Sequence, residues 1–141
     1  MKKIRHFMVW LLAIGLWPSC EDILEVPDIS NEEVLLVAPL DNTVVQQSEV
    51  NFTWNGIADV DAYWIQVATP NFTEAAQVLL DSIIVLDSTF AGTKAVQALT
   101  NGDYEWRVKG VNSAYGTPFS SSAFTVNAPD SPPTETPTTE E

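Results

Sequence analysis

The side chains that could perform chemistry in this chain are few, and their positions narrow the function. The 141-residue sequence holds one cysteine, Cys20, and one histidine, His6. A thiolate is a nucleophile and a metal ligand, and a histidine is a general base and a zinc ligand. Because no residue after Cys20 is of either type, the rest of the chain excludes cysteine nucleophiles, histidine bases and the common zinc sites.

Cys20 follows a segment with the layout of a secretory signal. Three basic residues open the chain: Lys2, Lys3 and Arg5. An eleven-residue apolar run (FMVWLLAIGLW, Phe7 to Trp17) and the small residue Ser19 come next. The run is too short to cross a bilayer, which takes about 20 residues. With a cysteine directly after the expected cut, residues 1–19 resemble a bacterial lipoprotein signal peptide, which implies that the Cys20 thiol is acylated and anchors the chain to a membrane.

The alternative is an ordinary secretion signal with an unmodified thiol next to the cleavage site. Such a thiol would be exposed to oxidation and cross-linking outside the cytoplasm. An odd cysteine in a secreted chain needs an explanation, and acylation supplies one. We therefore expect Cys20 to carry lipid.

The charge of the remaining chain limits its partners. Removal of residues 1–19 would leave 122 residues, enough for one domain, with three basic and 19 acidic side chains and a net charge of −16. That charge repels phosphate backbones and anionic membranes, so we expect no nucleic-acid partner and a membrane attachment that depends on lipid. No pair of carboxylates is placed to suggest glycoside hydrolysis. We expect no enzyme activity, no cofactor and no metal.

Composition divides the rest into a domain and two flanks. Residues 20–33 are acidic and lack periodicity, which predicts a flexible tether, and an acidic cluster there also resembles the surface-export signal of some Gram-negative lipoproteins. Residues 127–141 are rich in proline, threonine and acid and are predicted to be disordered. Residues 34–126 are left as the folded domain.

Residues 34–126 show the short alternating strands and turn signals of an antiparallel β-sandwich. Seven strands are expected, at residues 34–39, 50–54, 63–68, 78–86, 93–99, 104–112 and 121–126. No segment has helical periodicity. The alternation points Trp54, Tyr63, Tyr104 and Trp106 into the core. Truncation of Trp54 or Trp106 to alanine should cost about 3–5 kcal/mol.

Three pieces of this interval resemble a fibronectin type III domain. They are the opening LLVAPLDNT (35–43), the pair VNFTW (50–54) and YWIQV (63–67), and LTNGDYEWRV (99–108). The resemblance implies an immunoglobulin-like fold in which the sixth strand pairs with the third. It also implies that Tyr104 forms a tyrosine corner, with its hydroxyl bonded to the backbone just upstream. The resemblance is informative about fold and says little about function.

A candidate contact face follows from the same alternation. If Tyr63 points inward, Trp64 points outward, and Arg107 points outward on the strand expected beside it. An exposed indole next to a guanidinium could form a cation–π pair or a platform for a sugar ring. Tyr115 and Phe119 could extend the patch. The alternative is that these aromatic side chains only shield the sheet or anchor loops.

Weaker patterns mark other possible sites. Asp59 and Asp61 could contribute oxygens to Ca²⁺, although a calcium site needs six to eight. Ser82 and Ser88 lie in triplets (DSI and DST) that resemble an O-glycosylation signal of some Gram-negative surface proteins. Two N-glycosylation patterns, at Asn51 and Asn71, carry almost no weight in a bacterial lipoprotein.

Two functions remain open. The first is a non-catalytic lipoprotein of the cell envelope, held at the outer membrane, surface-exposed, and contacting a protein or glycan as an accessory module. The second rests on the LLVAP opening and the FTW and YWIQVA segments, which resemble the N-terminal module of polysaccharide-capturing lipoproteins of the starch-utilisation type. That resemblance implies glycan binding.

Overall fold

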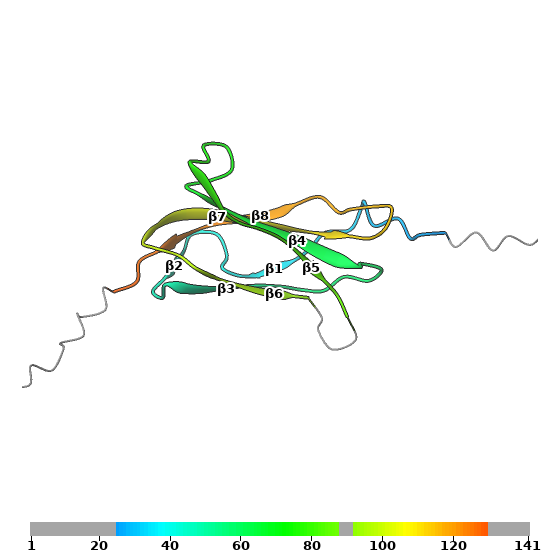
Figure 1. Ribbon diagram of the computed structural model, residues 1–141, viewed down its shortest axis with the longest axis horizontal. Helices are drawn as coiled ribbons and strands as arrows, with labels where there is room; N and C mark the ends of the chain where they lie inside the picture. Colours follow the sequence, from blue (N-terminus) through cyan, green and yellow to red (C-terminus); the bar gives the residue numbers. More distant parts are fainter. Residues whose placement is uncertain (1–24, 88–91, 130–141) are drawn as a thin grey trace, which may run out of the picture.

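The computed structural model describes residues 25–87 and 92–129 (Figure 1). The predictions for Cys20, Ser88 and residues 130–141 lie outside the described residues. Within them the structure contains strands and loops and no helix, and therefore none long and apolar enough to cross a membrane.

Eight strands form two sheets packed face to face (Figure 1). One sheet has the order β1-β3-β6 and the other the order β2-β8-β7-β4-β5. The strands are β1 (Leu36–Ala38), β2 (Thr43–Val45), β3 (Glu49–Trp54), β4 (Ala62–Thr69), β5 (Gln77–Val85), β6 (Lys94–Ala98), β7 (Gly102–Val111) and β8 (Ser120–Val126). The predicted all-β sandwich is confirmed, but the prediction of seven antiparallel strands is wrong: there are eight, and β2 pairs with β8 in parallel.

The additional strand is β2, which lies between the first two strands predicted from the sequence, 34–39 and 50–54. β1 pairs with β3 in one sheet, and β2 pairs with β8 in the other. Asn42 takes a φ of 62°, a left-handed conformation that asparagine tolerates, and its N–H donates to the Ala123 carbonyl at 2.9 Å. The Asp41 carboxylate accepts from the Ala123 N–H at 2.8 Å. This turn therefore redirects the chain into the second sheet.

Both ends of the domain extend beyond the predicted boundaries of 34 and 126. Residues 25–33, predicted to belong to a flexible tether, lie against the sandwich: Ile29 is 2% exposed, and the Pro27 carbonyl accepts from the Asn112 side chain at 2.9 Å. At the other end, the Ala128 N–H donates to Asn101 Oδ1 at 2.8 Å. A single buried isoleucine among acidic residues and a few hydrogen bonds to the backbone hold these segments against the domain. Amino-acid composition alone does not predict such contacts.

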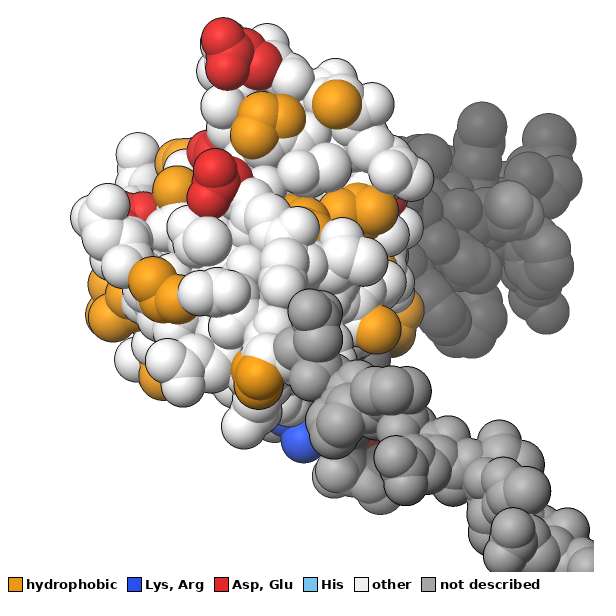
Figure 2. Space-filling view, turned by 90° about the vertical axis from the view of Figure 1, so that its left-hand side faces the viewer, with side chains coloured by type: hydrophobic (Ala, Val, Ile, Leu, Met, Phe, Trp, Pro, Cys, Tyr) orange, Lys and Arg blue, Asp and Glu red, His pale blue; other side chains and the backbone are white. Residues whose placement is uncertain are grey.

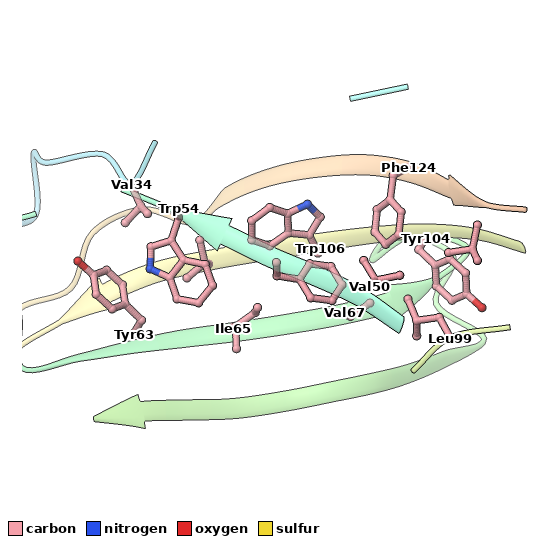
Figure 3. Close-up of a cluster of buried hydrophobic side chains, with 13 residues drawn as sticks. Val34, Val50, Trp54, Tyr63, Ile65, Val67, Leu99, Tyr104, Trp106 and Phe124 are labelled. Carbon is pink, nitrogen blue, oxygen red and sulfur yellow. The ribbon is translucent and has the colours of Figure 1, made fainter. Parts of the chain in front are cut away.

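The core between the sheets combines aromatic rings with valine, isoleucine and leucine side chains (Figure 3). Trp54, Tyr63, Tyr104 and Trp106 are all buried there, as the alternation predicts. Trp106 packs against Phe52 with ring centroids 5.1 Å apart, and its indole N–H donates to the Pro39 carbonyl at 2.8 Å. That carbonyl lies in the link between β1 and β2, so one buried hydrogen bond ties this link to β7.

The tyrosine corner is present in the geometry that the resemblance implies. The Tyr104 hydroxyl donates to the Thr100 carbonyl at 2.8 Å, just before the start of β7. The pairing of β7 with β4, the predicted sixth and third strands, is confirmed, with Arg107 opposite Gln66. This register decides which side chains meet on the outer surface of the five-stranded sheet.

The described chain enters and leaves the sandwich at opposite ends (Figure 1). The N-terminal segment, drawn in blue, lies at one end beside the β7–β8 connection, and the segment after β8 leaves at the other. The loop from residue 70 to 76, between β4 and β5, projects above the five-stranded sheet, away from the three-stranded one.

Candidate functional site

Five side chains form an aromatic–cation cluster on the outer face of the five-stranded sheet. They are Trp64, Phe72, Phe119, Arg107 and Lys109, and all are half-buried. Trp64 comes from β4 and the two cations come from β7, while Phe72 belongs to the projecting 70–76 loop and Phe119 directly precedes β8. The alternation of β4 and β7 turns these residues outward because Tyr63 and Trp106 face the core. The cluster therefore lies over β4, β7 and the start of β8, with the 70–76 loop at one side.

The guanidinium of Arg107 is held by rings and by one hydrogen bond. Its Cζ lies 4.0 Å from the centroid of Phe72 and 4.4 Å from that of Phe119. Its Nε donates to Gln66 Oε1 at 2.9 Å, across the β4–β7 register. A cation over an aromatic face is attracted by the ring quadrupole, so these contacts fix the position of the charge.

Lys109 holds the other positive charge, over the indole of Trp64. Its Nζ lies 4.8 Å from the Trp64 ring centroid and 4.9 Å from that of Phe119. Trp64 also meets Phe119 edge to face at 5.6 Å and donates its indole N–H to Asp81 Oδ1 at 2.6 Å. The indole of Trp64 is therefore engaged by three neighbours.

The carboxylates beside the cluster bond to neutral donors. Asp81 accepts from Trp64, and Glu105 Oε2 accepts from the Phe72 backbone N–H at 2.8 Å. That second bond attaches the 70–76 loop to β7 and places Phe72 over Arg107. Among the described residues, the structure gives neither Arg107 nor Lys109 an ion pair with a carboxylate. Both cations thus lie beside the carboxylates of Asp81 and Glu105 on this face but form no direct ion pair with them.

The structure places the predicted contact residues differently from the expected pairing. Trp64 and Arg107 both belong to the cluster, but the predicted Trp64–Arg107 cation–π pair is wrong, because Lys109 occupies the indole and Arg107 lies over two phenylalanines. Phe119 joins the cluster as suggested. Tyr115 is 41% exposed and lies in a turn in which the Asn112 side chain accepts its N–H, and none of the ring contacts found among the described residues involves it.

Sequence reasoning missed Phe72, Gln66 and Lys109 as members of this site. Phe72 lies in a turn, where no periodicity shows which way a side chain points. Lys109 could have been found from charge: beyond residue 5 the chain has only three cations, Lys94, Arg107 and Lys109. Two of these lie two residues apart on one strand, and hence on one face.

Apart from the cluster, a hollow of about 290 Å³ lies at the end of the sandwich where the N-terminal segment docks. It is lined by Glu25, Val26, Pro27, Asp59, Val60, Asp61, Asn112 and Ser113. Within residues 25–87 and 92–129, no three histidine, cysteine or acidic side chains come together as metal ligands, so Asp59 and Asp61 do not gain a third. The Asp59 carbonyl instead accepts from Asn112 at 3.1 Å, which anchors the loop. The nearby Asp28 has a lowered pKa because the Ser30 hydroxyl and N–H donate to its carboxylate.

The other sequence patterns give no site of comparable order. Ser82 is half-buried between Leu80 and Ile84 on the side of β5 that packs toward the core. Figure 2 views the end of the sandwich from which the C-terminal segment leaves; acidic side chains mark its upper part, and hydrophobic ones occur in separate small groups. The aromatic–cation cluster is therefore the most organised polar feature in the described part of the molecule.

The cluster contains groups that bind and none that is set up for bond making. Hydrogen-bond donors, cations and rings can hold an anion or a polar ligand. A general base or a nucleophile next to a base would be needed for acyl or glycosyl transfer, and the cluster has neither. The arrangement is suited to recognition.

Comparison with known proteins finds similar structures and no matching sequence. No protein-family model and no curated protein sequence matches the chain. Among similar solved structures are the fibronectin(III)-like modules of Clostridium thermocellum CbhA, at a TM-score of 0.48 and 16% identity, covering 68% of this chain and 98% of that one. CopC from Methylosinus trichosporium OB3b is also similar, at a TM-score of 0.41 and 13% identity, covering 68% and 95%. These values carry no argument about function.

Proposed function

We propose that this chain is a non-catalytic lipoprotein of the cell envelope, anchored through Cys20 at the outer membrane and exposed at the surface. Its fibronectin type III-like sandwich acts as an interaction module for a protein or glycan. The observation that carries the interaction role is the concentration of charge: two of the three cations beyond residue 5 lie together in the aromatic–cation cluster, in a chain with 19 acidic residues. Arginine and aromatic side chains held together at a surface are enriched in recognition sites.

The docked N-terminal segment supports close attachment to the membrane. A tether of residues 20–33 would reach about 50 Å when extended, at 3.3–3.6 Å per residue. Because residue 25 already lies at the body, the chain from Cys20 to Glu25 reaches at most about 18 Å. An acylated Cys20 would therefore hold the sandwich next to the lipid surface.

Anchoring and exposure can be tested on the full chain expressed in a Gram-negative host. We expect the native protein to partition into detergent and to incorporate a labelled fatty acid, and Cys20→Ser to do neither. Protease added to intact cells should degrade the native protein. An unlabelled Cys20 in the native protein would contradict the anchor, and resistance in intact cells but not in lysed cells would contradict surface exposure.

The interaction face can be tested with a photo-crosslinking residue at two exposed positions. Ser121 lies opposite Arg107 on β8, next to the cluster, and Asn51 lies on the outer face of the other sheet. We expect a discrete crosslinked product from position 121 and none from position 51. Equal products from both positions, or none from either, would contradict an interaction through the cluster.

Glycan binding is the second candidate. The sequence resemblance to polysaccharide-capturing lipoproteins motivates it, and the nearness of rings, a guanidinium and an amide in the cluster favours it. Trp64 is not a free stacking platform, because Lys109 covers its ring and Asp81 accepts its N–H. Any sugar contact would therefore depend on Arg107 and its surroundings.

A further inference from the structure

We propose that the aromatic–cation cluster binds a sugar that carries a single carboxylate, with the guanidinium of Arg107 as the group that recognises it. The proposal rests on the interaction role above and names the class of ligand. It follows from the way in which the charge of Arg107 is held, and from what the neighbouring carboxylates do.

A guanidinium interacts with rings through its flat face and with carboxylates through the N–H groups in its plane. The Arg107 Cζ lies over the rings of Phe72 and Phe119, at 4.0 and 4.4 Å from their centroids. Its Nε donates to Gln66. The terminal nitrogens form no hydrogen bond with another described residue, so this pair of donors is left for a ligand.

The neighbouring acids do not compete for this pair of donors. Glu105 is bonded to the Phe72 backbone and Asp81 to the Trp64 indole. Lys109 adds a second cation near by: Nζ and the Arg107 Cζ lie 4.9 and 4.4 Å from the Phe119 centroid, so they are at most 9.3 Å apart. The second cation therefore adds to the attraction that a ligand carboxylate bound at Arg107 would experience.

The charge of the whole molecule limits the ligand to one with little charge of its own. The domain is strongly acidic, so a polyanion such as an acidic protein or a nucleic acid is repelled over its length. A single carboxylate on a neutral sugar would meet only the charges of the cluster, two cations with Asp81 and Glu105 beside them, because more distant charges are screened beyond about 8 Å at physiological salt. A dianionic phosphate would be less well neutralised, since Glu105 lies on the same strand face.

The surroundings of Arg107 also suit a sugar better than a compact ion. The 70–76 loop, which carries Phe72 over Arg107, projects above the five-stranded sheet (Figure 1). The three half-buried rings offer apolar contacts to the C–H groups of a pyranose. The carboxylate would supply specificity, and the ring contacts would supply orientation.

The test measures binding of the full-length lipoprotein, in detergent, to two matched oligosaccharides. One carries a terminal glucuronic acid, and the other carries glucose at the same position. We expect the acidic probe to bind at least about tenfold more tightly by calorimetry. Arg107→Lys keeps the charge and loses the paired donors, and should weaken binding of the acidic probe by about 10- to 100-fold, the range expected for charge-assisted hydrogen bonds.

Lys94→Gln is the control for a general effect of charge, because it removes an exposed cation of the other sheet, whereas Arg107→Lys leaves the net charge as it is. It should leave binding unchanged, and unchanged thermal stability of Arg107→Lys should show that the fold is kept. Equal binding of the two probes would overturn the carboxylate proposal while leaving the glycan role standing. Failure of both probes, or tighter binding of inorganic phosphate or an acidic peptide, would overturn the sugar ligand, while the photo-crosslinking result would still judge the interaction role independently.

Discussion

Two groups of aromatic side chains lie on opposite faces of the five-stranded sheet, and they differ in their partners. On the inner face, Trp106 meets other rings: Phe52 at 5.1 Å and Trp54 at 6.3 Å between centroids. On the outer face, Trp64 and Phe119 meet each other and two cations. The inner rings exclude water and stabilise the fold, whereas the outer rings hold positive charges at the surface. The same residue types thus pack against one another on one face and against cations on the other.

Truncation of one tryptophan on each face tests this division most strongly. Trp106→Ala should lower the free energy of unfolding by about 3–5 kcal/mol, because it leaves a cavity among buried rings. Trp64→Ala should cost about 1–2 kcal/mol, since that side chain is only half-buried. Urea denaturation followed by circular dichroism measures both. Equal losses would contradict the division between the two faces.

Within the core, the two buried tryptophans differ in their hydrogen bonding. The Trp106 N–H donates to Pro39, whereas the Trp54 N–H has no partner among the described residues. Replacement by phenylalanine removes a similar apolar area from each. Trp106→Phe should therefore cost about 1–3 kcal/mol more than Trp54→Phe, because it leaves the Pro39 carbonyl without its donor. Equal unfolding free energies for the two variants would show that this bond contributes nothing.

The tyrosine corner should have a smaller effect. Tyr104→Phe removes the hydroxyl that donates to the Thr100 carbonyl and should cost about 0.5–1.5 kcal/mol. Tyr115→Phe, at an exposed ring, is the matched control and should change stability by less than about 0.5 kcal/mol. Thermal melting of both variants checks this, and a Tyr104→Phe protein as stable as the control would be the contrary result.

On the outer face, the loss of one cation should hardly affect the fold. Lys109→Gln removes the charge over Trp64 and should cost about 0.5–1 kcal/mol, the range for exposed cation–π contacts. The fluorescence of Trp64 should change, while Lys94→Gln should leave both stability and fluorescence as they are. A loss as large as that of Trp106→Ala would mean that the cluster belongs to the core.

Sequence alternation predicted the parts of the fold in which strands are long and one face is buried. In β4 and β7 it separated Tyr63 and Trp106 from Trp64 and Arg107. Long strands permit this because a side chain's face follows from its position in a period of two. The inner face of the sheet was therefore predictable residue by residue.

The elements that were missed depend on contacts between distant segments. β2 has three residues, and its pairing with β8 follows from the turn at Asn42, which local pattern does not specify. Phe72 reaches Arg107 because Glu105 accepts its backbone N–H, a contact across 33 positions. Charge counting would have identified the cations of the cluster, but only the folded loop shows which rings they meet.

The parallel pairing of β2 with β8 has a mechanical consequence. Thr43, Val44 and Val45 lie beside Phe124, Thr125 and Val126, and both strands run in the same direction. When the two ends of the chain are pulled apart, force acts on β2 at its first residue and on β8 at its last, so the two strands are pulled in opposite directions. The hydrogen bonds between them then bear the load together in shear and do not open one after another. These two short strands therefore resist separation when the domain is under tension.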